Sequence, residues 1–486
     1  MSWKNMSAFF NSRVLITFLI IFLGILPLSA QSQAPVQTIP GKLTLAEAEN
    51  LLLQRNLTIL ASRYQIEASR AARLIASYKP NPVLTVGAEQ FPFYSPLADS
   101  YPRFFSTNSD AGAQPTYTLR FDKITERGGK RELRTELADF QLKTAEAQML
   151  DAVRTQLFQL RQAFNNSILA RENLKLAEET EQQYGETERL TQVRLENGDV
   201  PAFELYRIRA GRLQFQQAVL QANTSYQQAT SDILNLLAAR TEEVVPRAVA
   251  QSSRDTLLTN IKLDTNQSTT GPAIPDSLHN AALEVIGGFD NRPVTQTLTE
   301  LRDIALSQRP DVIAARNTFE ATNKGVLLAQ AQLRRDLDIG YEYQRVGNDN
   351  SLGVVLQVPL FLYNNNQAAI KQSEAQRDAA AALLRQAELQ AVTDVEKAYR
   401  AYQSARSVLD LYNSENLGQV EKLKTISTFS FHEGAASLLE LLDAQRTYNQ
   451  SITSYNQASA DYQMSLWQLE QATGRPLRLG TTTTDQ

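Results

Sequence analysis

The chain has 486 residues, with 48 Lys and Arg against 52 Asp and Glu, which gives a net charge of −4. This near balance offers no basic field for nucleic acid and no acidic tail. The lack of cysteine excludes disulfides, zinc–thiolate sites, a Cys nucleophile and a lipidated Cys, and two His with four Met provide few ligands for soft metals.

The first thirty residues have the pattern of an export signal. Lys4 and Arg13 precede an apolar run from Val14 to Ala30 that ends in Leu-Ser-Ala. The run is shorter than the roughly 20 residues that a spanning helix needs. We therefore predict a cleaved secretory signal peptide at 1–30, in preference to an uncleaved anchor.

The remaining sequence contains an internal repeat. The segment from Thr44 aligns without gaps to the segment from Thr297, 253 residues later, whereas Gly198 and Gly434 are only 236 residues apart. The first half therefore has 17 extra residues, which we place in a loop rich in Pro, Ser, Asn and Gly at 92–115. We predict a first repeat at 31–239, a belt or linker at 240–293 with a short helix at 276–285, a second repeat at 294–474 and a flexible tail at 475–486.

Each repeat contains two segments in which apolar side chains alternate with polar ones, a pattern typical of strands. Tyr117, Leu119 and Phe121 form the clearest example. The four predicted strands lie at about 83–91, 116–124, 336–346 and 351–361. The alternation fits the half-buried sheet of a soluble protein, and it also fits membrane strands of about ten residues with apolar side chains outside.

A helix of some 65 residues follows each strand pair, from about 130 to 195 and from about 367 to 431. Such helices would be roughly 100 Å long. In the second one, apolar and small residues recur in alternating steps of three and four, as in coiled coils. Shorter helices at about 45–77, 202–237, 298–331 and 438–472 complete the repeats. A solvent-exposed coiled coil without a channel is the plainer structural alternative.

Two glycine-containing turns, at 197–201 and 433–437, reverse the chain at the end of each long helix. Glycine suits the left-handed position that ends a helix, and Asp199 or Ser437 can cap the helix that returns. The candidate residues of these two tips are Asn197, Gly198, Asp199, Glu433, Gly434, Ala435, Ser437 and Leu438.

Glycine and asparagine also mark the junctions between the strands and the long helices, because both tolerate positive φ. The sequence RGGKR lacks the spacing of a phosphate-binding loop. A proline near the end of the fourth strand lies where a missing N–H matters least. The candidate junction residues are Gly128, Gly129, Pro359, Asn364, Asn365 and Asn366.

Four strands leave two open edges, and open edges are not tolerated in lipid. If the strands lie in a membrane, several chains must therefore pool them. A trimer would supply twelve strands, which is within the known size range of membrane barrels.

Several segments resemble the TolC family of outer-membrane efflux proteins. They are EGAASLLELLDAQ, VPLFLYNNNQAAIKQSEAQ, ERGGKRELR and the duplicated layout, and the resemblance runs from about Lys42 to Arg475. LFLYNNNQAAI and RGGKR are most similar to the heavy-metal branch, whose members are partners of cation-exporting resistance-nodulation-division pumps.

The resemblance implies a fold that is mainly α with a β-barrel portion. The duplicated helix–strand–strand–long helix–tip–helix protomer would form a homotrimer with a 12-stranded outer-membrane β-barrel and a long periplasmic α-helical barrel. It would be the passive exit duct of a tripartite efflux system for metal cations or small toxic molecules. The tip residues would dock a periplasmic adaptor and an inner-membrane pump. The location would be the outer membrane of a Gram-negative bacterium, contacting its lipid, and the barrel alone would anchor the unlipidated chain.

Two other functions stay open at this point. One is the outer-membrane component of a type I protein secretion system, and the other is a periplasmic coiled-coil scaffold. We predict no enzyme activity and no cofactor, because no catalytic arrangement of side chains stands out. We predict no nucleic-acid partner, because the charge is nearly balanced. His432 beside Glu433 has no second ligand in sequence, so we predict no metal site, although a trimer would bring three copies of this histidine together.

Overall fold

The computed structural model describes residues 39–89, 115–240, 244, 283–347, 349–360 and 363–480. The chain divides into two units, Met1–Pro40 and Gly41–Gln486, and the account below concerns the second. The predicted signal peptide and nearly all of the predicted loop at 92–115 lie outside the described residues, as do much of the linker and the end of the tail.

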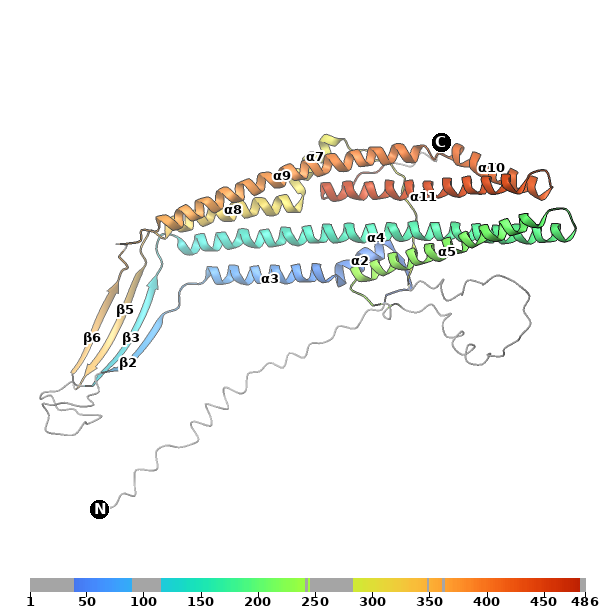
Figure 1. The fold of residues 1–486 in the computed structure, drawn as a ribbon. Helices are drawn as coiled ribbons and strands as arrows, with labels where there is room; N and C mark the ends of the chain where they lie inside the picture. The colour runs from blue at the N-terminus through green and yellow to red at the C-terminus, as the bar shows by residue number, and fades with distance from the viewer. Residues whose placement is uncertain are drawn as a thin grey trace, which may run out of the picture. The chain divides into compact units, whose positions relative to one another are not determined.

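The described chain is mainly helical and duplicated, which confirms the predicted fold class (Figure 1). The first half contains β1 (Lys42–Thr44), α2 (Leu45–Arg55), α3 (Leu57–Ser77), β2 (Val83–Glu89), β3 (Thr116–Thr125), α4 (Lys130–Glu196) and α5 (Ala202–Leu236). The second half contains β4 (Glu284–Ile286), α7 (Leu298–Gln308), α8 (Pro310–Ala331), β5 (Leu337–Val346), β6 (Asp349–Gln357), α9 (Gln367–Asp410), α10 (Ser414–His432) and α11 (Leu438–Thr473).

The two halves begin with the same local chemistry. Thr44 caps α2 in a capping box with Glu47, and Thr297 caps α7 in the same way with Glu300. Each box satisfies backbone N–H groups that the first helical turn leaves without partners.

Both opening helices, predicted to be continuous, are broken at equivalent positions. Asn56 caps α3 by accepting hydrogen bonds from the N–H groups of Thr58 and Ile59. In the second half Pro310 starts α8, because its ring fixes φ and its missing N–H is not needed at that position.

The predicted continuous helix at 367–431 is also wrong. It ends at Asp410 and a new helix starts at Ser414. The Asn413 side chain accepts a hydrogen bond from the Asn416 N–H (2.9 Å), and the Asn416 side chain donates to the Leu411 carbonyl (2.8 Å). These local bonds compete with the helical ladder, whereas α4 runs unbroken for 67 residues.

The four long strands form one antiparallel sheet in the order β2-β3-β5-β6. Arg120 of β3 lies opposite Glu342 of β5, and Phe121 lies opposite Tyr341. Instead of the predicted short helix at 276–285, the described end of that segment belongs to β4, which pairs in parallel with β1; residues 276–282 lie outside the described residues.

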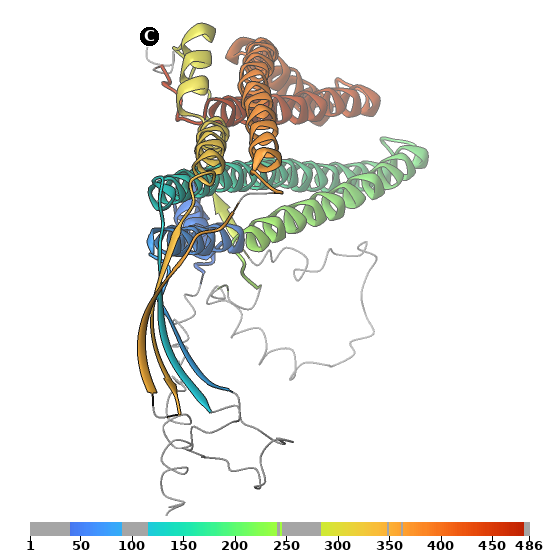
Figure 2. The same ribbon diagram turned by 90° about the vertical axis from the view of Figure 1, so that its left-hand side faces the viewer.

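The helices pack side by side in the same order as the strands to which they connect (Figures 1 and 2). α3 and α5 pack on α4, and α4 packs on α8 and α11. α8 packs on α9, and α11 packs on both α9 and α10. Small apolar side chains fill these contacts; one buried cluster consists of Leu301, Ala305, Val395, Ala398, Leu469 and Ala472. Among the described helices, none has the combination of length and hydropathy that crossing a bilayer requires.

Candidate functional site

The two tips are built by the same backbone turn. At the end of α4, the N–H of Gly198 donates to the Leu195 carbonyl (3.0 Å) and the N–H of Asp199 donates to the Arg194 carbonyl (2.9 Å). At the end of α10, Gly434 donates to Phe431 (3.1 Å) and Ala435 donates to Ser430 (2.8 Å). Both are Schellman motifs.

Both tip glycines have left-handed backbone angles, with φ of +81° at Gly198 and +75° at Gly434. A Cβ atom added at either position would have no atom within 4 Å. The requirement for glycine therefore comes from the backbone angle and not from crowding. Asn197 and Glu433 are the C-cap residues of α4 and α10 and directly precede the two glycines.

The helices that return from the tips start differently. Ser437 caps α11 by accepting from the Glu440 N–H (3.3 Å), and the Glu440 carboxylate accepts from the Ser437 N–H (3.1 Å). The prediction that Asp199 caps the other return helix is wrong. Pro201, not Asp199, is the N-cap residue of α5, and no side chain caps this helix, because proline has no side-chain acceptor for the backbone N–H groups of the first turn.

Arg194 of α4 joins the two tips. Its guanidinium donates to the carbonyls of Phe431 (2.9 Å) and His432 (2.8 Å) and lies 4.9 Å from the centre of the Phe431 ring. These carbonyls belong to the last turn of α10, where backbone oxygens lack helical partners and a cation is favourable. Leu438, the first residue of α11, is buried in the neighbouring apolar cluster.

Acidic and basic side chains hold the first hairpin, α4–α5, together. Arg212 pairs with Glu181 (2.8 Å) and Glu188 (2.9 Å), and Arg209 also pairs with Glu188 (2.9 Å). Partial burial raises the pKa of Glu188, but the hydrogen bonds from Arg209 and Arg212 outweigh it and hold that pKa below its usual value.

The second hairpin, α10–α11, is held differently. In the part of the chain that the structure describes, no ion pair joins α10 to α11. The Lys424 ammonium instead lies 4.1 Å from the centre of the Tyr448 ring. Burial lowers the pKa of Lys424, and the charges of Glu179 and Glu421 counteract this only in part.

Polar side chains line the contact between α4 of the first hairpin and α11 of the second. Thr180 bonds to Asn449 (3.1 Å) and Asn456 donates to Asn173 (3.2 Å). The buried Gln445 has no partner for its side-chain oxygen. Neutral hydrogen bonds contribute only about 1 kcal/mol each, so the charge-assisted hydrogen bonds of Arg194 are the stronger link between the two hairpins.

The first strand-to-helix junction contains Gly128 and Gly129, which both have positive φ. A Cβ atom at Gly128 would lie 2.8 Å from Cδ of Arg334, so the junction also needs space there. Lys130 donates to the Asp336 carboxylate (2.8 Å), which also accepts from the Arg127 N–H (2.9 Å). The RGGKR motif therefore connects the first long helix to the start of β5.

The second junction contains the asparagine run. Asn366 has a φ of +61°, and its side chain donates to the Ala329 carbonyl (2.8 Å). The Asn364 side chain accepts from the Asn366 N–H (2.9 Å), and that of Asn365 accepts from Gln367 (3.4 Å). β6 ends at Gln357, so Pro359 follows the strand and does not interrupt its pairing.

The sheet has one charged face and one apolar face. Arg120, Asp122 and Glu342 share the charged face, where Arg120 donates to Asp122 (2.7 Å). The apolar side chains on the other face are exposed; Leu352 is 87% exposed and Val354 is 70% exposed. β2 and β6 each pair on one side only among the described strands.

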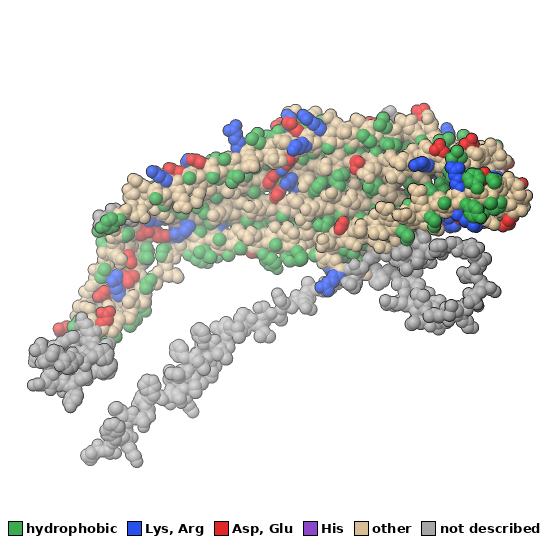
Figure 3. Space-filling view, viewed as in Figure 1, with side chains coloured by type: hydrophobic (Ala, Val, Ile, Leu, Met, Phe, Trp, Pro, Cys, Tyr) green, Lys and Arg blue, Asp and Glu red, His purple; other side chains and the backbone are tan. Residues whose placement is uncertain are grey.

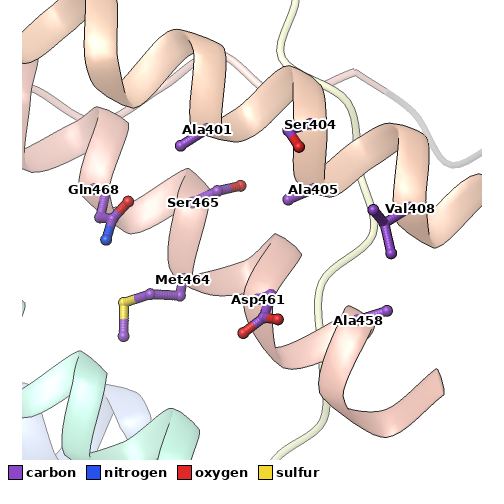
Figure 4. A pocket seen from close by; sticks show the side chains of 9 residues that line it. All are labelled: Ala401, Ser404, Ala405, Val408, Ala458, Asp461, Met464, Ser465 and Gln468. Atoms are coloured by element: carbon purple, nitrogen blue, oxygen red, sulfur yellow. The ribbon is translucent and has the colours of Figure 1, made fainter. Parts of the chain in front are cut away.

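A groove of about 390 Å³ lies between α9 and α11 (Figure 4). Figure 4 shows mostly small side chains there, such as Ala405 and Ser465, with Asp461 as the one ionisable residue. Elsewhere in the described ranges, no group of three or more His, Cys, Asp or Glu side chains is placed to hold a metal ion. His432 is exposed at the tip, with its ring 6.4 Å from that of Phe431.

The sequence matches the family described as Outer membrane efflux protein at residues 49–239 and 301–475, one segment in each half. The chain belongs to the outer membrane efflux protein family. This family is one of transporters. The match includes both tips, both long helices and all four strands of the sheet.

Three related proteins are similar to this chain in fold or in part of the sequence. Outer membrane protein TolC of Vibrio cholerae is 27% identical over 194 residues, which are 37% of this chain and 44% of TolC. The match therefore spans less than half the length of this curated relative. The solved structure of CusC has a TM-score of 0.65 at 16% identity and covers 92% of this chain and 96% of CusC. That of VceC from Vibrio cholerae has a TM-score of 0.64 at 17% identity, covering 89% and 96%. These likenesses concern the fold.

Sequence reasoning missed the contacts that lie between the two halves of this outer membrane efflux protein. Arg194 meets Phe431 across 237 positions, and Lys130 meets Asp336 across 206. Periodicity within one helix carries no information on such pairs. The one signal for such a contact in the sequence was the cluster of basic residues at RGGKR together with the carboxylate of Asp336 just before β5.

Proposed function

We propose that this protein is the outer-membrane exit duct of a tripartite efflux system, and that three copies close into one channel. The observation that carries the proposal is that sheet and helices are open on the same two sides. β2 and α3 are the outermost strand and helix on one side, and β6 and α9 are the outermost strand and helix on the other. Each open side has hydrogen-bonding groups or apolar side chains that lack a partner among the described residues.

Exposed apolar residues follow a coiled-coil spacing on the first open side. On α3 they are Leu57, Leu60, Tyr64 and Leu74, and on α5 they are Phe203, Tyr206, Leu213 and Leu220; Ile75 is also exposed, next to Leu74. Apart from Ile75, these positions step by three and four or by sums of these, the spacing at which one helix packs against another. A helix that already packs on α4 and has a second stripe is suited to a second neighbour.

The other open side offers a matching surface. Leu423, Ile426 and Phe429 of α10 are exposed. Ile426 and Phe429 precede Gly434 by eight and five residues, and Tyr206 and Phe203 follow Gly198 by the same intervals. The two groups are therefore at equal distances from their tips. Surfaces that differ but complement each other generate a closed ring of copies when the rotation between neighbouring copies closes.

The exposed apolar face of the sheet supports placement in lipid. In water this face would be costly to expose, at about 25 cal/mol per Å². Joining β6 of one copy to β2 of the next would satisfy both open edges, as membrane strands require. Three copies would form a barrel of twelve strands, with the charged face inside and the outer membrane of a Gram-negative bacterium outside.

In this arrangement the tips lie in the periplasm, where they dock an adaptor and an inner-membrane resistance-nodulation-division pump. The docking residues are Asn197, Gly198, Asp199, Glu433, Gly434, Ala435 and Ser437, whereas Leu438, also a candidate from the sequence, is buried and supports the tip from within. Energy comes from the pump, and the duct is passive. Adaptor contact shifts the tips from a closed to an open population, which requires the Arg194 hydrogen bonds to the second hairpin to break.

The substrates we propose are metal cations or small toxic molecules. The junction sequences RGGKR and LFLYNNNQAAI support this class, through their resemblance to the heavy-metal branch. Deleting the gene should lower tolerance of Cu, Ag, Zn, Co or Cd salts. Loss of secreted proteins with unchanged metal and drug tolerance would favour type I secretion instead.

Planar-bilayer recording tests the duct itself. The purified protein should run as a heat-sensitive trimer on gels and give discrete single-channel steps. A monomer without conductance would leave the periplasmic scaffold as the better account and would contradict the duct.

A further inference from the structure

Exposed basic side chains occur at three of the four places where the chain crosses between a strand and a helix. Lys79 lies between α3 and β2, Arg127 between β3 and α4, and Arg334 between α8 and β5. All three are exposed. They belong to separate segments of the chain. Because the strands and the helices that they connect to lie side by side in the same order, all three residues lie where the sheet meets the helices.

The nearby carboxylates do not neutralise these three bases. Glu126 is mostly buried and pairs with Arg134 (2.8 Å). Asp336 takes the Lys130 ammonium (2.8 Å) and the backbone N–H, not the side chain, of Arg127. Where the sheet meets the helices, Figure 3 shows Lys and Arg side chains beside Asp and Glu side chains. Among the described residues, none of the ion pairs at these crossings includes the side chain of Lys79, Arg127 or Arg334.

Exposed apolar and aromatic side chains accompany these bases. Tyr78 adjoins Lys79, and Leu333 adjoins Arg334. At the fourth crossing, between β6 and α9, Leu360 and Tyr363 are exposed. Tyrosine between aliphatic and basic residues is typical of the boundary between hydrocarbon and headgroups. The exposed apolar face of the sheet begins directly beyond this level.

We propose that this basic collar, consisting of Lys79, Arg127 and Arg334 with Tyr78, Leu360 and Tyr363, binds anionic glycerophospholipid headgroups of the membrane leaflet next to the helices. Lys and Arg provide donors for the headgroup phosphate, and the tyrosine rings lie at the ester level. The inference rests on the proposed function, because it needs the sheet to lie in the outer membrane.

Lipid binding to the intact, detergent-solubilised oligomer tests the collar. Phosphatidylglycerol and phosphatidylcholine are added in turn, and bound lipid is measured by native mass spectrometry. Phosphatidylglycerol should bind at least about tenfold more tightly at about 0.15 M salt, and the preference should shrink at about 1 M, where charges are screened within ~3 Å. Equal binding of the two lipids would overturn the proposal without any variant being needed.

A triple variant locates the site. Lys79→Gln, Arg127→Gln and Arg334→Gln remove three charges, and glutamine keeps the Cβ, Cγ and Cδ atoms with which Arg334 packs beside Gly128. The preference for phosphatidylglycerol should fall to within about twofold. The matched control changes three exposed bases far along the helices, Arg207, Arg385 and Lys422, to glutamine and should keep the preference.

Two further outcomes would also overturn the proposal. One is an undiminished preference in the collar variant, and the other is displacement of phosphatidylglycerol by inorganic phosphate alone, which would indicate a free-phosphate site. Planar-bilayer conductance separates this inference from the proposed function. A protein that conducts but shows no lipid preference refutes only the collar, whereas a protein that does not conduct refutes the duct.

Discussion

The two tip hairpins end in the same turn but are held together by different interactions. The α4–α5 hairpin has an unbroken long helix and a network in which Glu181 and Glu188 pair with Arg209 and Arg212. The α10–α11 hairpin has a break before Ser414, and a cation–π contact takes the place of such a network. Duplication has preserved the shape of the turn and not its support, so we expect the second hairpin to be the part that moves.

Removing the link between the hairpins should have the largest effect. Arg194→Ala deletes two charge-assisted hydrogen bonds to α10, each worth about 1.5–3 kcal/mol. The ratio of open to closed channels in planar bilayers should rise by about tenfold or more. Arg194→Lys should give a smaller rise, because the ammonium keeps a charged donor for the α10 carbonyls. It should still give some rise, because an ammonium cannot reproduce the planar contact with the Phe431 ring.

Arg209→Ala is the matched control, because Arg209 pairs within the first hairpin only. Its open probability should stay near that of the unmodified protein. An equal rise in both variants would mean that general loosening of the tips, and not the link between hairpins, controls opening.

Substitution of the tip glycines should affect transport more than assembly. Valine at Gly434 must adopt a φ of +75°, at a cost of about 1–2 kcal/mol, but its Cβ atom would have no neighbouring atom within 4 Å. Efflux in cells that depend on the protein should fall while the heat-sensitive trimer persists on gels. Gly198→Val provides the comparison in the first hairpin. If the trimer is lost to the same degree as efflux, Gly434 is only a structural turn residue.

The starts of the return helices should respond unequally to loss of a polar side chain. Ser437→Ala removes a capping box and should destabilise the first turn of α11 by about 1 kcal/mol. Hydrogen exchange at 438–441 should then accelerate about fivefold. Asp199→Ala should leave exchange at 202–205 unchanged, because Asp199 caps no helix. Faster exchange there would mean that Asp199 does cap α5, as the sequence suggested.

The smallest expected difference is a local one in the unmodified protein. Backbone amides at 412–416 should exchange faster than those at 176–180, the equivalent stretch of α4. The Asn413 break leaves the amides at the start of α10 without helical partners, whereas α4 is continuous there. Equal protection of the two stretches would mean that the second long helix is as stiff as the first.

The sequence was sufficient for the features that depend on local chemistry. The repeat, the alternating strands and the two glycine turns follow from period and backbone preference, which act within a few residues. The break at Asn413 was missed because apolar spacing continues on both sides of it, although Asn followed three residues later by Asn416 is itself a capping pattern. Asp199 was misassigned because Pro201 supplies the helix start.

Contacts between distant segments could not be read in this way. Arg194 has no feature in its own helix that singles it out, and its partners are carbonyl groups that every residue has. The carboxylate that neutralises Lys130, that of Asp336, also depends on how the two halves pack. The open sides of the molecule became visible only when the order of helices and the order of strands could be compared.

Cross-linking between copies tests the central claim, that the two open sides meet in a closed ring. The chain has no cysteine, so Tyr206→Cys combined with Ile426→Cys introduces one thiol on each side at equal distance from the tips. After oxidation, denaturing gels should show covalent dimers and trimers and nothing larger, while either single variant should stay monomeric. A double variant that yields only monomers, or only a cross-link within one chain, would contradict the account.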